Sequence, residues 1–292
     1  MDNNIGIIGQ GFVGTAVRVG FEGVFEVHTY DINKNSTCSS LTELCERSKI
    51  IFVCVPTPMN KDGSCNTEIV ENVLEDLNRL SKGHIAVLKS TVPPGTTERL
   101  GSKYKNLSLV FNPEFLTEAN FIQDFKNQDR IIVGGPRPAT TIIKNLYRKR
   151  FPSTPILKTG SNTAEMVKYF CNCFLATKVS FANEMRQICE QKNIDYDKVV
   201  EYSLYDKRIG KTHLSTPGPD GRYGFGGSCF PKDVNAIIKV MLECNINPAI
   251  MTAVWEKNLE VRPDRDWEKL IGRAVSIEEP MKFVKDQQAD ER

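Results

Sequence analysis

Short apolar runs alternate with amphipathic windows through the first half of the chain. One such window is 66–80, with Asn66 as a candidate N-cap at its start. Its residues Ile69, Val73 and Leu77 recur at helical spacing, which predicts a helix with one apolar face. The apolar runs are rich in β-branched residues and bounded by Gly, Pro, Asn or Asp, which predicts strands. Strands that alternate with helices indicate βαβ units and parallel pairing. The predicted strands are 5–8, 27–30, 50–55, 85–89, 108–111 and 130–133.

The pattern changes in the second half, where helical windows follow one another without strands between them. The run 162–191 contains neither Pro nor Gly, which predicts one long helix that forms the spine of a second domain. A further helix is predicted at 196–204, and another at 231–242 after a loop rich in Gly and Pro.

A glycine motif follows the first predicted strand directly. Gly9-Gln10-Gly11-Phe12-Val13-Gly14 opens a predicted helix, and Asp31 ends the second strand. In a dinucleotide-binding turn, the first glycine permits the bend, the second admits a pyrophosphate and the third lets helix and strand pack closely. A carboxylate at Asp31 accepts hydrogen bonds from a ribose 2′-hydroxyl, which favours NAD over NADP. The alternative is a glycine-rich turn without a ligand. Lys34 is either a further cofactor contact or a solvated lysine.

These features predict an α/β fold in which an N-terminal Rossmann-like parallel sheet precedes an all-helical central domain with a long spine helix. The expected divisions are 1–160 for the NAD-binding domain, 161–262 for the central domain and 263–292 for a short polar tail.

Composition and charge exclude several classes of partner. The 292 residues are 40% apolar and 25% charged, which is typical of a soluble globular protein with two domains. A formal net charge of +2, without a block of like charges, does not favour nucleic acid or a membrane surface. The chain begins without a secretory signal pattern and has no long apolar run, so we expect a cytoplasmic protein. Nine scattered cysteines without C-x-x-C spacing favour a reducing compartment, and they indicate neither a disulfide framework nor a metal site.

Two stiff loops follow the third and fourth predicted strands, where a doubly wound sheet places its ligand. The loop 55–58 contains Pro56 and Thr57, and the loop 89–98 contains Thr91. Proline fixes φ in both loops, so we expect them to be rigid. The Thr91 hydroxyl either meets the nicotinamide end of a cofactor or caps a turn.

Two pairs of polar residues spaced four apart are candidate chemical groups. Glu114 and Glu118 lie on one face if their segment is helical, and such closeness would raise one carboxyl pKa toward that of a general base. Exposed glutamates are the alternative. Lys168 and Asn172 stand among apolar residues of the long helix, where a lysine needs an anionic partner unless it reaches the surface.

Cys229 stands between a glycine-rich stretch and Pro231, a residue favoured in the first turn of a helix. Its sulfur should therefore lie at the positive end of a helix dipole. The dipole lowers a thiol pKa by less than about one unit, so ionisation also needs a cation such as Lys168 or Lys232. Asp233 opposes ionisation and must have another role. A buried, inert cysteine is the alternative.

In their order along the chain, these motifs resemble the UDP-glucose/GDP-mannose dehydrogenase family over about residues 1–260. The family consists of NAD-dependent enzymes that oxidise a nucleotide-sugar alcohol twice, to a carboxylate, as in the conversion of UDP-glucose to UDP-glucuronate. The motifs are the glycine turn at 9–14, STVPPGTT at 90–97, NPEFLTE at 112–118, the Lys168/Asn172 helix and GFGGSCFPKD at 224–233.

The resemblance implies a role for each matched residue. Cys229 would be the nucleophile, with Asp233 and Thr91 handling a water or proton, Lys168 and Asn172 stabilising oxyanions, and Glu114 and Glu118 assisting thioester hydrolysis. Cofactor contacts are expected from Gly9, Gly11, Phe12, Val13, Gly14, Asp31, Lys34, Pro56, Thr57, Thr91, Glu118 and Lys232. Substrate contacts are expected from Glu114, Phe115, Leu116, Lys168, Asn172, Arg208, Phe225, Gly226, Gly227 and Cys229. Arg208 would reach a neighbouring subunit's substrate, in a homodimer built on the long helix.

The chain also departs from the family pattern. Family members normally continue into a second nucleotide-binding domain, which we expect this chain to lack. As a hypothesis, the loop 211–223 takes over part of the nucleotide contact through Lys211, His213 and Arg222. Two other functions stay open: a two-electron hydroxyacid-type dehydrogenase, and a non-catalytic NAD-binding scaffold.

Overall fold

The computed structural model describes residues 4–277 and divides the chain into two compact units. The first unit contains the chain up to Thr57 and Thr67–Lys168, and the second contains Pro58–Asn66 and the chain from Tyr169 onward. The predicted tail at 263–292 lies outside the described residues from 278 onward.

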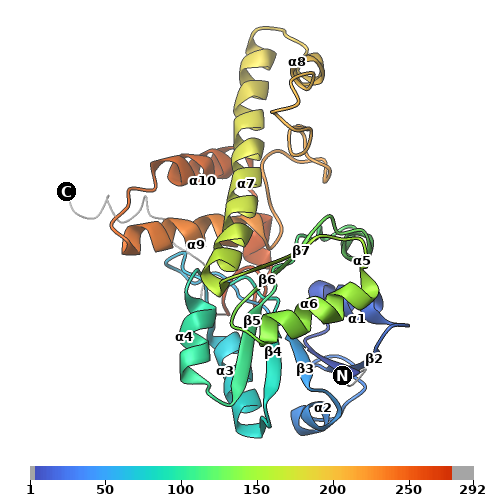
Figure 1. Cartoon of the computed structure of the whole chain (residues 1–292). Helices are drawn as coiled ribbons and strands as arrows, with labels where there is room; N and C mark the ends of the chain where they lie inside the picture. Colours follow the sequence, from blue (N-terminus) through green and yellow to red (C-terminus); the bar gives the residue numbers. More distant parts are fainter. Residues whose placement is uncertain (1–3, 278–292) are drawn as a thin grey trace, which may run out of the picture. The chain divides into compact units, whose positions relative to one another are not determined.

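A seven-stranded sheet organises the first unit among the described residues (Figure 1). Its order is β2-β1-β3-β4-β5-β6-β7. All neighbours pair in parallel except β5 and β6, which meet antiparallel at Phe111 and Gly134 alone. The expectation of parallel pairing is therefore wrong at this junction, because apolar runs carry no information on the direction of a strand. The strands are β1 (Asn4–Ile8), β2 (Glu26–Tyr30), β3 (Ile50–Val53), β4 (His84–Leu88), β5 (Leu107–Phe111), β6 (Ile131–Gly134) and β7 (Ile156–Thr159).

The six predicted strands are confirmed with shifts of one or two residues at their ends. The seventh, β7, was not predicted. It is four residues long, and Leu157 and Lys158 are exposed, so its sequence lacks the continuous apolar run of a buried strand.

Helices cover both faces of the sheet, as alternation along β4 demonstrates. Ile85 and Val87 join one apolar cluster with side chains of α1, α5 and α6, whereas Ala86 and Leu88 join another with α2, α3 and α4. Burial on both faces is the usual state of a parallel sheet. The helices are α1 (Phe12–Phe21), α2 (Leu41–Arg47), α3 (Glu68–Leu80), α4 (Thr96–Lys103), α5 (Phe121–Lys126) and α6 (Ala139–Arg150).

The start of α3 differs from the prediction. The helix begins at Glu68 and its N-cap is Thr67, not Asn66. The Thr67 hydroxyl donates to the Glu71 carboxylate at 2.9 Å instead of capping a backbone N–H.

The second unit is helical among its described residues. The spine α7 (Ser161–Gln191) starts in the first unit and continues here, as the uninterrupted run predicted. The predicted α8 (Tyr196–Ser203) and α9 (Phe230–Glu243) are confirmed, whereas α10 (Ala249–Val261) and the 3₁₀ turn η1 (Asp266–Lys269) were not predicted.

The core of the second unit contains Phe225, Trp255 and Trp267, and the two indole rings lie 5.2 Å apart. The segment Pro58–Asn66 packs here as well, through an ion pair between Asp62 and Lys239 of α9 at 2.9 Å.

Within residues 4–277, no helix combines the length and the hydrophobicity that a membrane span requires.

Candidate functional site

The glycine turn of the first unit has the geometry that its sequence predicts. Gly9 has a φ of +88°, and a Cβ there would lie 2.6 Å from the Cys54 carbonyl oxygen. A Cβ on Gly14 would lie 1.8 Å from the Gly9 carbonyl oxygen, so only glycine lets α1 approach the turn this closely. A Cβ on Gly11 would meet no described atom within 4 Å, which leaves room for a ligand over the backbone. Phe12 and Val13 begin α1.

Asp31 and Lys34 tie the end of β2 to this turn. One Asp31 carboxylate oxygen accepts from the Gln10 N–H at 2.6 Å, and the other accepts from the N–H groups of Asn33 and Lys34. The Lys34 ammonium donates to the Gln10 carbonyl at 2.7 Å. Lys34 is thus bound to the turn rather than only solvated. A carboxylate offers about four acceptor sites, so Asp31 retains capacity for ribose hydroxyls.

The loops after β3 and β4 are joined by hydrogen bonds. The Thr57 hydroxyl donates to the Thr91 carbonyl at 2.8 Å, and the Ser90 hydroxyl donates to the Val55 carbonyl at 2.6 Å. Thr57 and Thr91 are buried, and Pro56 lies between the two bonded positions of its loop. The two loops therefore act as one rigid edge at the carboxyl ends of neighbouring strands.

The segment after β5 is not helical, which removes the shared helical face expected for Glu114 and Glu118. Glu114 is buried, whereas Glu118 is exposed in a turn. Glu114 accepts from the Lys168 ammonium at 2.9 Å, and its carbonyl accepts from the same group at 2.6 Å. Lys168 is therefore buried with an anionic partner, as its apolar surroundings require.

This ion pair reverses the expected pKa shift of Glu114. Burial acts to raise the pKa of Glu114, but the Lys168 charge and hydrogen bond, the Leu116 N–H and Lys89 hold it below the ordinary value. The neighbour that sets this pKa is thus a lysine 54 residues away, not the second glutamate. Phe115 stands beside the pair, with its ring 5.6 Å from the Lys168 ammonium.

A buried polar network that the sequence patterns did not identify supports this segment. The Lys89 ammonium donates to the Asn112 side-chain oxygen at 3.0 Å, and the Tyr147 hydroxyl donates to the same oxygen. The Asn112 amide donates to the Ile132 carbonyl at 2.7 Å. Burial lowers the pKa of Lys89 to about 8, although Glu114 acts to raise it. Asn112 thus fixes the segment that presents Glu114, using one partner directly after β4 and others from β6 and α6.

In the second unit, Cys229 is the N-cap residue of α9, with Pro231 in the first turn. This confirms the predicted position at the positive end of a helix. Cys229 is partly exposed, whereas five of the other cysteines are buried. All nine cysteines lie among the described residues and are unbonded to one another.

Asp233 is bound from two sides in the first turn of α9. Its carboxylate accepts from the Lys232 ammonium at 2.5 Å and from the Asn172 amide of α7 at 2.6 Å. Burial acts to lower the pKa of Lys232, but Asp233, Cys65 and Cys229 together raise it above the ordinary value. A permanent cation therefore stands near Cys229, and the Asp233 charge that would oppose thiolate formation is paired.

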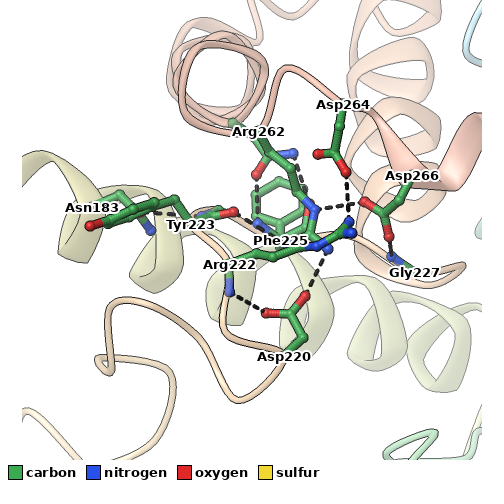
Figure 2. Close-up of polar contacts among 11 residues, drawn as sticks. Asn183, Asp220, Arg222, Tyr223, Phe225, Gly227, Arg262, Asp264 and Asp266 are labelled. Atoms are coloured by element: carbon green, nitrogen blue, oxygen red, sulfur yellow. Dashed lines mark hydrogen bonds and ion pairs between the residues drawn. The ribbon is translucent and has the colours of Figure 1, made fainter.

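The remaining predicted substrate residues occupy different environments. Arg208 is exposed and its guanidinium binds Asp206. The Phe225 ring packs in the core 6.3 Å from the Trp255 ring. Figure 2 shows Phe225 and Gly227, and in the sequence Gly226 and Gly227 lie between Phe225 and the Ser228–Cys229 pair. Arg222, a hypothetical nucleotide contact, forms an ion pair with Asp264 at 2.6 Å.

The predicted site residues thus form two groups, one in each unit. The first unit holds the glycine turn, the paired loops, Phe115, Leu116 and the Glu114–Lys168 pair. The second unit holds Asn172, Cys229, Lys232 and Asp233. Their contacts with a cofactor or substrate stay predictions.

Comparisons with known proteins match both units. Residues 33–151 match the NAD binding domain of the UDP-glucose/GDP-mannose dehydrogenase family, and residues 162–260 match its central domain. A UDP-glucose 6-dehydrogenase of Pseudomonas aeruginosa is 37% identical over 233 residues, which cover 75% of this chain and 50% of that protein. One of Haloferax volcanii is 31% identical over 308 aligned residues, covering 89% of this chain and 70% of that protein.

A comparison with solved structures also finds a nucleotide-sugar dehydrogenase. The chain aligns with a UDP-glucose dehydrogenase from Pyrobaculum islandicum at a TM-score of 0.79 and 29% identity, over 92% of this chain and 70% of that one. The chain spans about half the length of the first curated relatives that it matches.

Proposed function

The chain belongs to the UDP-glucose/GDP-mannose dehydrogenase family, and on this premise we propose that it oxidises UDP-glucose to UDP-glucuronate with NAD. The observation that carries the proposal is the placement of Cys229, partly exposed at the N-cap of α9 with the Lys232 cation near it. A two-electron dehydrogenase has no use for a thiol in this position.

The first unit supplies the residues for a dinucleotide. Gly11 leaves space over the backbone, the start of α1 offers N–H groups to a pyrophosphate, and Asp31 offers acceptors to a ribose. The residues of this unit proposed to complete the contact set are Lys34, Pro56, Thr57, Thr91 and Glu118. Lys232, which belongs to the second unit, stays a predicted cofactor contact from the family resemblance. NAD, when bound, accepts the two electrons and the hydrogen that leave the sugar carbon at each oxidation.

The proposed chemistry requires a nucleophile between two oxidations. The C6 alcohol loses a proton and a hydride to become an aldehyde, which cannot readily give up a second hydride. Addition of the Cys229 sulfur to that carbon forms a thiohemiacetal, whose C–H bond then breaks to leave a thioester. Water cleaves the C–S bond, which releases the carboxylate and restores the thiol. Two NAD and one water are consumed for each sugar.

Polar and charged residues are proposed to support these steps. The Asp233 carboxylate, held by Asn172 and Lys232, and Thr91 would handle a water or proton in the first oxidation. Lys168 and Asn172 would stabilise the oxyanions, an effect worth about 3 kcal/mol for one preorganised donor. Glu114 and Glu118 would assist hydrolysis of the thioester.

The first test counts NADH for the intact protein. We expect two NADH for each UDP-glucose consumed, measured at 340 nm against chromatographic analysis of the sugar product. GDP-mannose and UDP-N-acetylmannosamine serve as parallel substrates and establish which hexose is preferred. A ratio of one would instead indicate a two-electron dehydrogenase, and bound NAD without turnover of any nucleotide sugar would indicate a non-catalytic protein.

We also propose that the chain forms a homodimer through α7. Phe170, Phe174 and Phe181 are 57–66% exposed, and their spacing of four and seven places them along one stripe of the helix. The rings of Phe170 and Phe174 stack with centroids 6.3 Å apart. Arg208, which extends from the chain after α8, would then contact the substrate of the second copy.

The dimer predicts a clear effect of one charge. Phe174→Glu should convert the protein to a monomer, as measured by sedimentation equilibrium. The new carboxylate would be buried in the dimer interface without a partner. The exposed control Ile250→Glu, on α10, should leave the mass unchanged. A monomeric wild-type protein, or a dimeric Phe174 variant, would refute the proposal.

A further inference from the structure

A buried arginine anchors the loop that leads to Cys229. Arg262, which is 3% exposed, donates from Nε to Asp266 at 2.6 Å and from a terminal nitrogen to Asp220 at 2.7 Å (Figure 2). Its other terminal nitrogen donates to the Tyr223 carbonyl at 3.3 Å. Arginine suits this position because its rigid fork serves several acceptors while the charge persists. We name Asp220, Arg262 and Asp266 the Arg262 clamp.

Side chains also hold the backbone of the loop at three positions, Gly224, Phe225 and Gly227. Asp266 accepts from the Gly227 N–H at 3.2 Å with the oxygen that does not bind Arg262. The buried Asn258 accepts from the Phe225 N–H at 2.7 Å and donates to the Phe225 carbonyl at 2.9 Å. Asn183 accepts from the Gly224 N–H at 3.1 Å. The main chain just before Ser228 and Cys229 is therefore bound by three different segments of the unit.

The glycines of this loop are explained by the same contacts. A Cβ on Gly226 would lie 2.4 Å from an Asp266 oxygen and 2.5 Å from an Arg262 nitrogen. Gly224 has a φ of +68°, and a Cβ there would lie 2.5 Å from the Asn258 side-chain oxygen. The glycine-rich approach to Cys229 thus allows the Arg262 clamp and Asn258 to press directly against the main chain.

We propose that Arg262 and Asp266 are positioning residues for Cys229, which they keep at the N-cap of α9 by fixing the main chain of 224–227. This inference rests on the proposed function for the role of the thiol. Both residues lie beyond residue 260, where the match to the family's central domain ends. These two members of the Arg262 clamp therefore come from the segment that follows the residues matched by the central-domain model.

The charges of the Arg262 clamp favour the state in which Arg262 is paired with Asp266 and Asp220. Burial acts to raise the pKa of Asp266, but the hydrogen bond and charge of Arg262 and the Gly227 N–H hold it below the ordinary value. Asp220 provides the second carboxylate against Arg262. Removal of either Arg262 or Asp266 would leave a partly buried charge without its main partner, so the loop should open.

The test compares Asp266→Asn, Arg262→Met and Arg262→Lys with the matched control Asp264→Asn. Asp264 belongs to the same segment and binds Arg222 near the surface. Hydrogen exchange followed by mass spectrometry measures the opening of the loop in a peptide covering 220–229. Iodoacetamide at pH 7 measures the reactivity of Cys229, with the exposed Cys244 as internal standard. Turnover of UDP-glucose gives the NADH count per sugar.

Asp266→Asn and Arg262→Met should speed exchange of the loop peptide at least tenfold, with peptides of the first-unit sheet unchanged. Alkylation of Cys229 should slow at least threefold relative to Cys244, because the thiol leaves the helix terminus and Lys232. NADH per sugar should fall from two toward one, because aldehyde escapes before the second oxidation. Arg262→Lys keeps the positive charge and should therefore show a smaller change than Arg262→Met in all three measurements. Asp264→Asn should match the wild type.

Unchanged loop exchange would refute the clamp. Faster exchange with unchanged or faster alkylation of Cys229 would refute its positioning role. If the intact protein oxidises no nucleotide sugar, the proposed function fails, while exchange and alkylation still decide the positioning role. If Arg262→Met does not fold, the nearly isosteric Asp266→Asn carries the same comparison.

Discussion

Replacement of Cys229 by serine is expected to lower the rate of UDP-glucuronate formation about 10³-fold or more. Removal of a catalytic nucleophile commonly costs this much, and a serine hydroxyl without a dedicated base adds poorly to an aldehyde. The first oxidation does not need the sulfur. The variant should therefore consume one NAD per sugar and release aldehyde, which a hydrazine reagent can trap.

The number of NADH formed per sugar distinguishes loss of the nucleophile from loss of stability. A variant that had only lost stability would make less product at an unchanged ratio of two NADH per sugar. Cys244→Ser is the matched control, because Cys244 is the exposed C-cap residue of the helix that Cys229 begins. It should retain wild-type rate and stoichiometry. Full four-electron turnover by Cys229→Ser would overturn the thioester mechanism, while the family assignment would stand.

The parts of the fold that the sequence predicts are those set by local chemistry. A run of residues without Pro or Gly predicted α7. Pro231, after a glycine-rich stretch, predicted a helix from about residue 231 with Cys229 at its N-terminal end, which α9 confirms within one residue. The glycine turn was recognisable because Gly9, Gly11 and Gly14 stand at a fixed spacing directly after a predicted strand and at the start of a predicted helix. Each of these signals is contained in one stretch of chain.

Hydrogen bonds and ion pairs between residues far apart in the chain left no such signal in the sequence. Glu114 and Glu118 suggested a shared helical face, but their segment is not helical, and Glu114 binds Lys168, which is 54 residues away in the chain. Lys89 ended a predicted strand without any indication that Asn112 and Tyr147 would surround it. Arg262 and Asp266 occur in a charged stretch that resembles an exposed surface, yet the arginine is buried. The spacing of residues along the sequence indicates periodic secondary structure. The contacts of Glu114, Lys89 and Arg262 depend instead on how elements far apart in the sequence pack together.

The Glu114–Lys168 pair is expected to show the largest effect on stability. Both side chains are buried, and removing one partner strands the other charge in an apolar setting, which typically costs about 3–5 kcal/mol. Lys168→Met and Glu114→Gln should each lower the free energy of unfolding by that amount in urea denaturation. The double variant should lose less than the sum, because neither charge is left alone.

The pH dependence supplies an independent check with a definite sign. The folded-state pKa of Glu114 lies below its ordinary value of 4.5, so its ionised form stabilises the fold above that value. This contribution is lost as pH falls through the lowered folded pKa, and Glu114→Gln lacks it at every pH. The stability difference between wild type and Glu114→Gln should therefore shrink on acidification below pH 4.5. The exposed pair Glu75–Arg79 is the control, since Glu75→Gln should change stability little at any pH. A pH-independent difference, or additive single losses, would show that Glu114 and Lys168 do not stabilise the fold as an ion pair.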